Sequence, residues 1–222
     1  MNKDNRNYVF TSDSLSERDE YQRMASWIPG GSRVIDLGSG DGSLLALLQK
    51  RGIQGEGIEI AESGVEITKK RGIKAQIGRI DVPLPYKDKE FDYALCNVTI
   101  QMVMYPEVLL QEMKRIAKYQ ILSFPNFAFL PNRLDLLIRG RMPHFMIPSY
   151  KWYSTGHIHQ LSINDFSDLC KELNLKILDS KHIRPDVLRL HIFQVPHFIL
   201  RRFPNVFVST AIFLTKEKEI AK

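Results

Sequence analysis

The segment from Asp36 to Gly42, with sequence DLGSGDG, places two carboxylates among three alternating glycines. Glycines at this spacing allow a tight turn at Gly38 and the close approach of a ligand at Gly40, and we expect Gly42 to let the next helix pack near the sheet. Glu59 follows 21 residues after Gly38. A carboxylate at that point can accept hydrogen bonds from both hydroxyls of a ribose. The pattern therefore predicts a site for a nucleotide-type cofactor.

The same loop discriminates between two cofactors. NAD would need its diphosphate at the start of the helix, but the third glycine of G-x-G-x-x-G falls at position 43, which is Ser43. Asp36 and Asp41 would also repel a diphosphate. S-adenosylmethionine carries an ammonium and a sulfonium, which carboxylates suit. We therefore expect S-adenosylmethionine or S-adenosylhomocysteine, and the alternative is a turn that needs its glycines but binds nothing.

Two later polar residues support this cofactor more weakly. Asp81 follows the third predicted strand, where a side chain can meet the adenine, and Asn97 ends the fourth. The predicted cofactor-binding residues are Asp36, Gly38, Ser39, Gly40, Gly42, Glu59, Ile60, Asp81 and Asn97.

The elements that would position these residues alternate between strands and helices. The strands are expected at 33–37, 55–60, 74–77, 91–97 and 119–124, and the helices at 15–28, 43–51, 62–71 and 106–117. This alternation is typical of βαβ units, so we predict a doubly wound α/β fold with a mostly parallel sheet.

The pattern changes after Phe124. Residues 126–156 are rich in proline, aromatic residues and arginine, and we interpret them as a cap with a short helix at 132–139. Regular elements return with a helix at 162–173, for which Ser162 is a plausible N-cap, and with strands at 175–179 and 206–215. The prediction is one domain over residues 1–222, with the cap between strands five and six.

Charge and cysteine content narrow the function classes. Residues 1–130 hold 17 basic and 17 acidic residues, whereas residues 131–222 hold 14 and 8, so the whole excess of +6 lies in the second part. This excess is either a solvated surface or a surface for an anionic substrate or an acidic partner. Without a nucleic-acid motif, a long apolar run or a signal peptide, we expect no membrane span, no nucleic-acid partner and a cytoplasmic location. Two cysteines fit neither a disulfide framework nor a metal site.

The cap contributes further candidates for chemistry. His157 and His159 would share one face of a strand, where they could act as bases, but two ligands do not make a metal site. Tyr150, Trp152 and Tyr153 could line an acceptor pocket or simply pack. No catalytic residue is predicted, because methyl transfer depends mainly on the positioning of the acceptor against the sulfonium.

Six segments in this order resemble the MetW family of methionine biosynthesis proteins: VIDLGSGDGSLL, GEGIEI, EFDYALCNVTIQMV, LSFPNF, LLIRGRMP and KWYSTGHIHQLSINDFSDLC. The similarity covers about residues 28–180. The glycine loop is common to class I methyltransferases, whereas the later segments are specific to the family. The sequence departs from the family at Arg79, where Asp is usual, so Asp81 would have to substitute at the adenine. It departs again at His157, where Asn is usual.

The resemblance implies the seven-stranded fold of class I methyltransferases and a partner, homoserine O-acetyltransferase. The expected function is an S-adenosylmethionine-binding, methyltransferase-like protein of methionine biosynthesis that acts with that acyltransferase. The alternative is a methyltransferase for a small anionic acceptor, independent of any acyltransferase.

Overall fold

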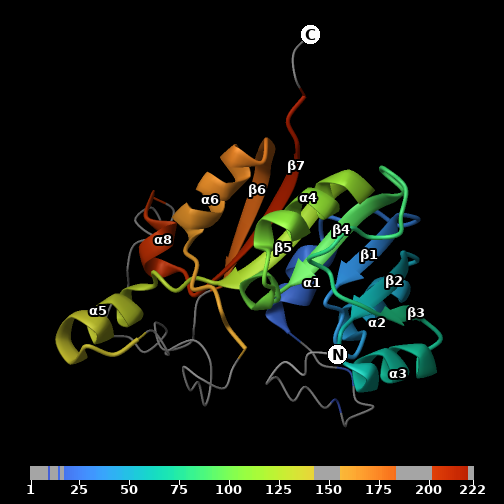
Figure 1. Ribbon diagram of the computed structural model, residues 1–222, viewed down its shortest axis with the longest axis horizontal. Coiled ribbons are helices and arrows are strands. Elements are labelled where there is room, and N and C mark those ends of the chain that lie inside the picture. The colour runs from blue at the N-terminus through green and yellow to red at the C-terminus, as the bar shows by residue number, and fades with distance from the viewer. Residues whose placement is uncertain (1–9, 11–14, 16–17, 143–155, 184–201, 220–222) are drawn as a thin grey trace.

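The computed structural model describes residues 10, 15, 18–142, 156–183 and 202–219. Within these ranges seven strands form one sheet, in the order β3-β2-β1-β4-β5-β7-β6 (Figure 1). The strands are β1 (Arg33–Leu37), β2 (Gln54–Glu59), β3 (Lys74–Ile77), β4 (Phe91–Asn97), β5 (Ala117–Pro125), β6 (Leu175–Ile183) and β7 (Thr210–Glu217).

The first five strands are parallel, and β7 is antiparallel to both of its neighbours, β5 and β6. The sheet is therefore the mostly parallel, seven-stranded sheet that the sequence predicted. From β1 the chain builds outward to β2 and β3, and then returns to add β4 on the other side of β1. Ligands of open α/β sheets bind at the carboxyl edge where the strand order reverses in this way. That position lies between the ends of β1 and β4.

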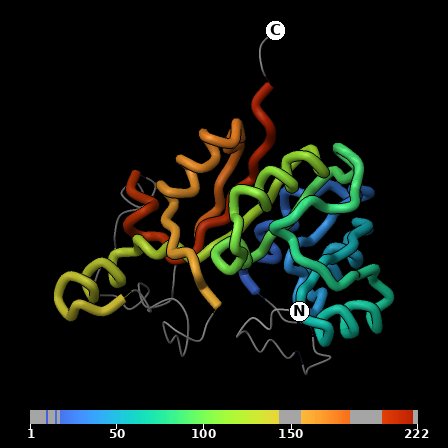
Figure 2. The backbone as a smooth tube through the Cα atoms, in the orientation of Figure 1, coloured from blue at the N-terminus to red at the C-terminus, as the bar shows by residue number. Residues whose placement is uncertain are grey.

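Helices cover both faces of the sheet (Figures 1 and 2). The described helices are α1 (Asp19–Ala25), α2 (Ser43–Gln49), α3 (Glu62–Lys70), the 3₁₀ turn η1 (Ile100–Met102), α4 (Pro106–Ile116), α5 (Leu130–Arg139), α6 (Ile163–Glu172) and α8 (Pro204–Phe207), and α5 projects away from the sheet. In the part of the chain that the structure describes, no helix has the length and apolar character needed to cross a membrane.

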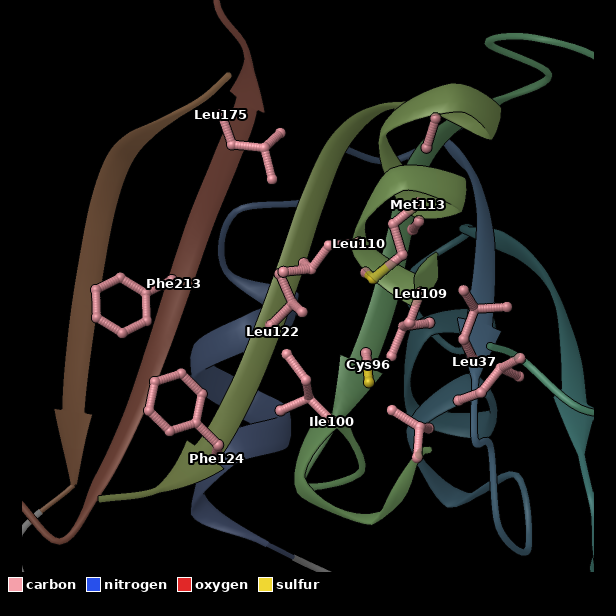
Figure 3. Packing of buried hydrophobic residues seen from close by; sticks show 14 of the residues in the cluster. Leu37, Cys96, Ile100, Leu109, Leu110, Met113, Leu122, Phe124, Leu175 and Phe213 are labelled. Atoms are coloured by element: carbon pink, nitrogen blue, oxygen red, sulfur yellow. The ribbon is translucent and has the colours of Figure 1, made fainter. Parts of the chain in front are cut away.

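Alternating strand residues divide the core into two clusters. Ile35, Cys96 and Leu122 face α4 and α6, and Figure 3 shows Leu109 and Met113 of α4 near Cys96 and Leu122. The residues next to them on the strands, such as Val34 and Leu95, belong to the second cluster with α1 and α2. Because side chains alternate along a strand, Asp36 follows Val34 onto the α1 side. The sheet thus carries a carboxylate at the end of β1 into the interior.

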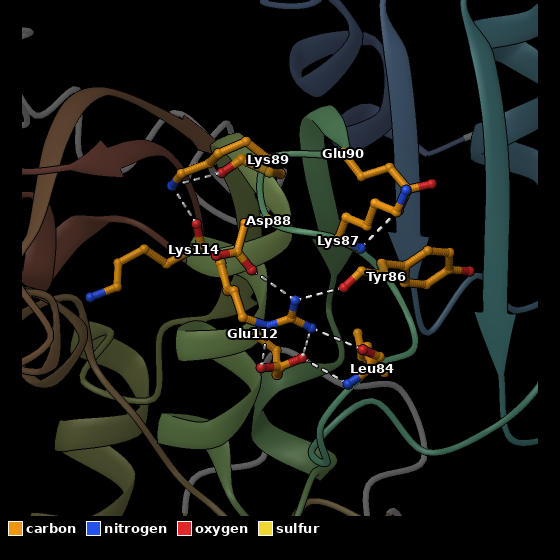
Figure 4. A network of polar contacts seen from close by, with 10 residues as sticks. Leu84, Tyr86, Lys87, Asp88, Lys89, Glu90, Glu112 and Lys114 are labelled. Carbon is orange, nitrogen blue, oxygen red and sulfur yellow. Dashed lines mark hydrogen bonds and ion pairs between the residues drawn. The ribbon is translucent and has the colours of Figure 1, made fainter.

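A polar clamp fixes the loop between β3 and β4 (Figure 4). The guanidinium of Arg115, near the end of α4, donates to the carbonyls of Leu84 (2.9 Å) and Tyr86 (2.6 Å) and to both carboxylate oxygens of Glu112. Glu112 in turn accepts from the amide of Leu84 at 2.7 Å. The clamp holds the loop between β3 and β4, which contains Asp81, against α4.

Most predicted elements are confirmed, and the main errors lie at the two ends. The predicted helix at 15–28 has only Asp19–Ala25 as α-helix, and the predicted strand at 206–215 begins as helix α8. Pro204 sits in the first helical turn, where its fixed φ starts a helix, and an apolar run alone does not distinguish the two structures. The strand predicted at 175–179 continues to Ile183 because it pairs with β7 over its whole length.

Candidate functional site

The glycine loop joins β1 to α2 with three residues in the left-handed region. Gly38, Gly40 and Gly42 have φ of 83°, 56° and 73°. A Cβ on Gly38 would lie 2.7 Å from the side chain of Thr99, in the segment after β4, and one on Gly42 would lie 2.6 Å from Thr68 Oγ1. Position 38 therefore requires glycine both for its left-handed turn and because Thr99 leaves no room for a Cβ. Gly42 allows the close approach of Thr68 in α3, whereas the sequence predicted that it would allow close packing of the next helix on the sheet.

Glu59 at the end of β2 holds the loop through backbone amides. Its Oε2 accepts from Gly40 N–H at 2.8 Å, and its Oε1 accepts from the amides of Ile60 (2.8 Å) and Ala61 (2.9 Å). The side chain is buried, with 7% of the residue exposed. A carboxylate has about four acceptor positions, so this one retains capacity for one further donor. That position is on Oε2, so a ribose that used both oxygens would have to replace one of the two amides on Oε1.

Asp36 is the buried carboxylate without a complete set of partners. The residue is 2% exposed, and its Oδ1 accepts no hydrogen bond. Burial, reinforced by the negative charge of Glu59, raises the pKa of Asp36 from 3.8 to about 7. The Oγ of Ser39, two residues beyond the strand, is also buried without a partner. Buried polar atoms in this state favour a ligand that donates hydrogen bonds or carries positive charge.

Asp41 is engaged within the protein. Its carboxylate accepts from the amide and the hydroxyl of Ser43 at 3.1 Å and 2.8 Å. Arg71 at the end of α3 forms an ion pair with it, with an Nη1–Oδ2 distance of 3.5 Å. The argument against a diphosphate therefore rests on Asp36 more than on Asp41, because Arg71 offsets the charge of Asp41.

Asp81 connects two loops at the carboxyl edge. It accepts two hydrogen bonds from Arg79 (3.0 and 3.1 Å) and further ones from the amides of Met104 (2.9 Å) and Tyr105 (3.3 Å). These bonds outweigh its burial and hold the pKa of Asp81 below its ordinary value. The residue that replaces the family's usual Asp, Arg79, is thus a partner of Asp81. A contact from Asp81 to an adenine remains a prediction, and adenine would compete with these donors.

The segment after β4 carries backbone strain beside the loop. Asn97 Oδ1 accepts from Ser123 Oγ at 2.6 Å, so Asn97 is tied to β5. Val98 follows with φ of 51°, a conformation that a β-branched residue adopts only when its surroundings impose it. Such strain often accompanies a binding or catalytic site.

Residues far along the chain complete this region in ways that the sequence did not indicate. The fully buried Gln101 accepts at its backbone carbonyl from the amides of Ile158 (3.0 Å) and His159 (3.1 Å). Its side-chain Oε1 has no partner. His157 and His159 lie in an extended segment outside any strand, so the prediction of a shared strand face was wrong. Tyr150, Trp152 and Tyr153 lie outside the described residues.

Phe10 reaches the glycine loop from the amino-terminal part of the chain. Its amide donates to Ser63 Oγ at 3.2 Å, and a Cβ on Gly40 or Gly64 would come within 3.3 Å or 3.1 Å of its ring. No local sequence pattern signals this contact.

No metal site competes with the loop in the part of the chain that the structure describes. It contains no group of three or more His, Cys, Asp or Glu residues able to hold a metal ion. A shallow hollow of about 480 Å³ lies between Glu56, Lys69 and Ile73. This hollow faces the start of β3, away from the carboxyl edge, and we do not assign it to the cofactor.

Comparison with known proteins gives one family and one fold. Residues 18–215 match the family described as methionine biosynthesis protein MetW. A bifunctional methionine biosynthesis protein MetXA/MetW of Rhodopirellula baltica is 36% identical over 163 residues, which are 68% of this chain and 26% of that protein. The chain therefore spans about a quarter of this relative.

Solved methyltransferases have the same fold. A SAM-dependent methyltransferase of Thermotoga maritima, described as a possible histamine N-methyltransferase, is 21% identical, with a TM-score of 0.63 over 90% of this chain and 87% of the other. The magnesium protoporphyrin IX methyltransferase of Synechocystis, solved with bound SAH, is 16% identical, with a TM-score of 0.63 over 90% and 82%. At these identities the likeness establishes the fold alone.

Proposed function

The chain belongs to the MetW family of methionine biosynthesis proteins, and from this we propose that it binds S-adenosylmethionine or S-adenosylhomocysteine and acts with homoserine O-acetyltransferase. The observation that carries the cofactor proposal is the buried, unpartnered Oδ1 of Asp36 beside the left-handed glycines of the loop. The observation that carries the partner proposal is the Rhodopirellula baltica relative, which is a bifunctional MetXA/MetW protein.

The hydrogen-bond acceptors of the loop fit an adenosyl amino acid. Asp36 Oδ1 and Ser39 Oγ are acceptors without partners, and the ammonium of the cofactor supplies donors and charge for them. Glu59 Oε2 accepts only from Gly40 N–H and keeps an acceptor position for one ribose hydroxyl. Ile60 is 48% exposed beside Glu59, so its side chain is free to cover an apolar ring face. A cationic ligand also relieves the cost of ionising Asp36.

The residues of this chain would act by positioning. When bound, S-adenosylmethionine supplies an electrophilic methyl group at its sulfonium. The carboxylates would orient the cofactor. Gly38 and Gly40 add no side chains of their own to the loop, and the spaces beside them are taken by Thr99 and Phe10.

The second candidate function, methyl transfer to a small anionic acceptor, has an observation of its own. The strained Val98 and the unpartnered Gln101 Oε1 lie next to the loop, at the carboxyl edge of β4. Such strain and unmet hydrogen bonding are typical of a substrate site. This candidate requires turnover that does not depend on the acyltransferase.

Two experiments test the proposal. Titration calorimetry of the purified chain should show binding of S-adenosylmethionine and S-adenosylhomocysteine but not of NAD, and preferential binding of NAD would refute the cofactor assignment. Co-purification with homoserine O-acetyltransferase of the same organism, followed by its acyl-transfer assay with and without this chain, tests the partner. No association and no change in acyl transfer would leave the methyltransferase candidate in front.

A further inference from the structure

Helix α5 buries polar side chains and exposes aliphatic ones. Its two buried residues are polar, Asn132 at 1% and Asp135 at 4% exposure, whereas Leu137 and Ile138 are 81% and 75% exposed and Leu134 is 44% exposed. A helix that belongs to the core of its own domain faces that core with its apolar stripe. Exposed contiguous apolar surface on a globular protein marks an interaction site.

Three of the four exposed aliphatic residues of α5 form one stripe, and the fourth, Leu136 at 47% exposure, lies off it. Leu134, Leu137 and Ile138 have the spacing i, i+3, i+4, which places them on the same side of the helix; we call them the α5 stripe. Two polar residues face inward instead: Asn132 Nδ2 donates to the Phe127 carbonyl (3.3 Å) just before the helix, and Asp135 pairs within the helix with Arg139 (3.3 Å). The helix thus buries these polar residues and presents the α5 stripe outward.

The position of α5 leaves the stripe accessible. Figures 1 and 2 show α5 projecting beyond the β6 end of the molecule, on the opposite side from α3. No described strand or helix packs closely along it. A partner could therefore cover α5 without entering the glycine loop.

Charge decides between the possible occupants. Residues 130–142 contain three arginines and one aspartate, and Asp135 is already buried against Arg139. Two copies of α5 packed together would bring like charges into contact, which disfavours self-association. An arginine-bearing helix with an aliphatic face also suits an anionic membrane surface, and the relative that joins MetXA and MetW in one protein favours the acyltransferase over that surface. An apolar groove bordered by carboxylates complements both the stripe and the arginines.

We propose that the α5 stripe is the docking surface of this chain for the acyltransferase, and that it inserts into an apolar, acid-rimmed groove of that enzyme. This inference rests on the proposed function and gives it a surface. The arginines beside the stripe steer the encounter, and the aliphatic side chains hold the complex. Association should therefore slow with added salt, while the rate of dissociation changes little.

The test is surface plasmon resonance between the full chain and the purified homoserine O-acetyltransferase of the same organism. The variant Leu137→Asp/Ile138→Asp should weaken association about 100-fold or more, mainly through faster dissociation, because two large aliphatic side chains lose their burial. Arg133→Glu/Arg141→Glu should instead reduce the association rate and its salt dependence. Arg139 is left in place because it pairs with Asp135.

Leu178→Asp is the matched control, since Leu178 is 40% exposed on β6, away from α5. It should bind the acyltransferase like the wild type, and all variants should bind S-adenosylhomocysteine with unchanged affinity, which shows that they are folded. If the wild type binds and the α5 double variant binds equally well, the docking surface is refuted and the proposed function stands. If the wild type does not bind, the partner proposal fails together with the surface.

Two further measurements address the other occupants. The first is flotation with vesicles of phosphatidylcholine and phosphatidylserine. If the wild type floats with the vesicles and the α5 double variant does not, while the double variant still binds the acyltransferase, α5 is a membrane contact and the proposal is overturned. The second is sedimentation velocity. If the wild type is a dimer and the double variant is a monomer, the α5 stripe binds a second copy of this chain, and the docking proposal is overturned as well.

Discussion

The pH dependence of stability should change when Asp36 loses its charge. Asp36 is buried, and its pKa rises from 3.8 to about 7 on folding. The folded state therefore binds more protons than the unfolded state between these two values. A carboxyl group shifted upward gives stability that is complete below the unfolded pKa and is lost as the pH rises through the folded pKa. Asp36→Asn removes this loss.

The magnitude follows from linkage. One pKa unit corresponds to about 1.36 kcal/mol, so ionised Asp36 costs the folded chain about 4 kcal/mol above pH 8, and about 2 kcal/mol of that has accumulated by pH 5.5. The stability difference between Asp36→Asn and wild type should therefore grow by about 2 kcal/mol from pH 5.5 to pH 8.5. Any constant effect of the amide on packing cancels in this comparison.

The assay is urea unfolding of the cofactor-free protein at pH 5.5, 7.0 and 8.5. Unfolding is followed by the fluorescence of Trp27. This residue packs against the second core cluster, and its indole N–H donates to Asp179 at 2.9 Å. Asp92→Asn is the control, because a hydrogen bond from Lys118 lowers the pKa of Asp92. Asp92 is then ionised throughout this pH range, and its stability difference should be flat. A flat difference for Asp36→Asn as well would refute the reasoning.

The remaining predictions concern the loop and one helix cap. Glu59→Ala should weaken cofactor binding by about 1.5–3 kcal/mol in calorimetry, since charge-assisted bonds to the ribose are lost, and Gly40→Val should weaken it more; unchanged affinity in both would mean that the cleft binds no cofactor. Gly64→Ala would place a methyl group 2.5 Å from the Gly40 carbonyl and should cost about 2 kcal/mol of unfolding free energy, whereas Gly30→Ala, with 3.6 Å of space, should cost far less. Ser162→Ala should cost about 1 kcal/mol in the same urea assay, because the capping box with Asp165 is lost; no change there would show that the cap is dispensable.

Asp36 also provides a test that links stability to function. A cationic ligand favours the ionised form of Asp36, so binding of S-adenosylmethionine near pH 6 should release a proton. Calorimetry in buffers of different ionisation enthalpy measures that proton, and Asp36→Asn should abolish its release. Identical proton counts in the two proteins would place the ammonium elsewhere.

Features that depend on neighbours along the chain were predictable from the sequence. Strand and helix periodicity predicted the succession of β1 to β5 along the chain. The glycine spacing predicted the tight turn after β1, whose glycines are left-handed in the structure. Ser162 was identified as an N-cap, and its capping box with Asp165 is present. These features arise within a few residues, where spacing and residue type report the backbone conformation directly.

The state of each site residue was decided by tertiary structure. The sequence placed Glu59 at a ribose, but the fold occupies its oxygens with three amides, one of them 19 residues away. It placed Asp81 at an adenine, but the fold engages it with Met104 and Tyr105. Which acceptors stay available depends on donors brought from other loops, and spacing does not record them.

The sequence by itself determined that a doubly wound sheet presents a glycine loop and a following carboxylate at one edge, because alternation and glycine spacing are local properties. Only the tertiary structure decided that Asp36 is buried with its pKa near 7, that Phe10 lies on the loop and that α5 exposes its aliphatic side. Burial and hydrogen-bond partnership are set by segments distant in the chain. A residue's type shows what it can bind, and the packing around it determines which of its atoms are left to do so.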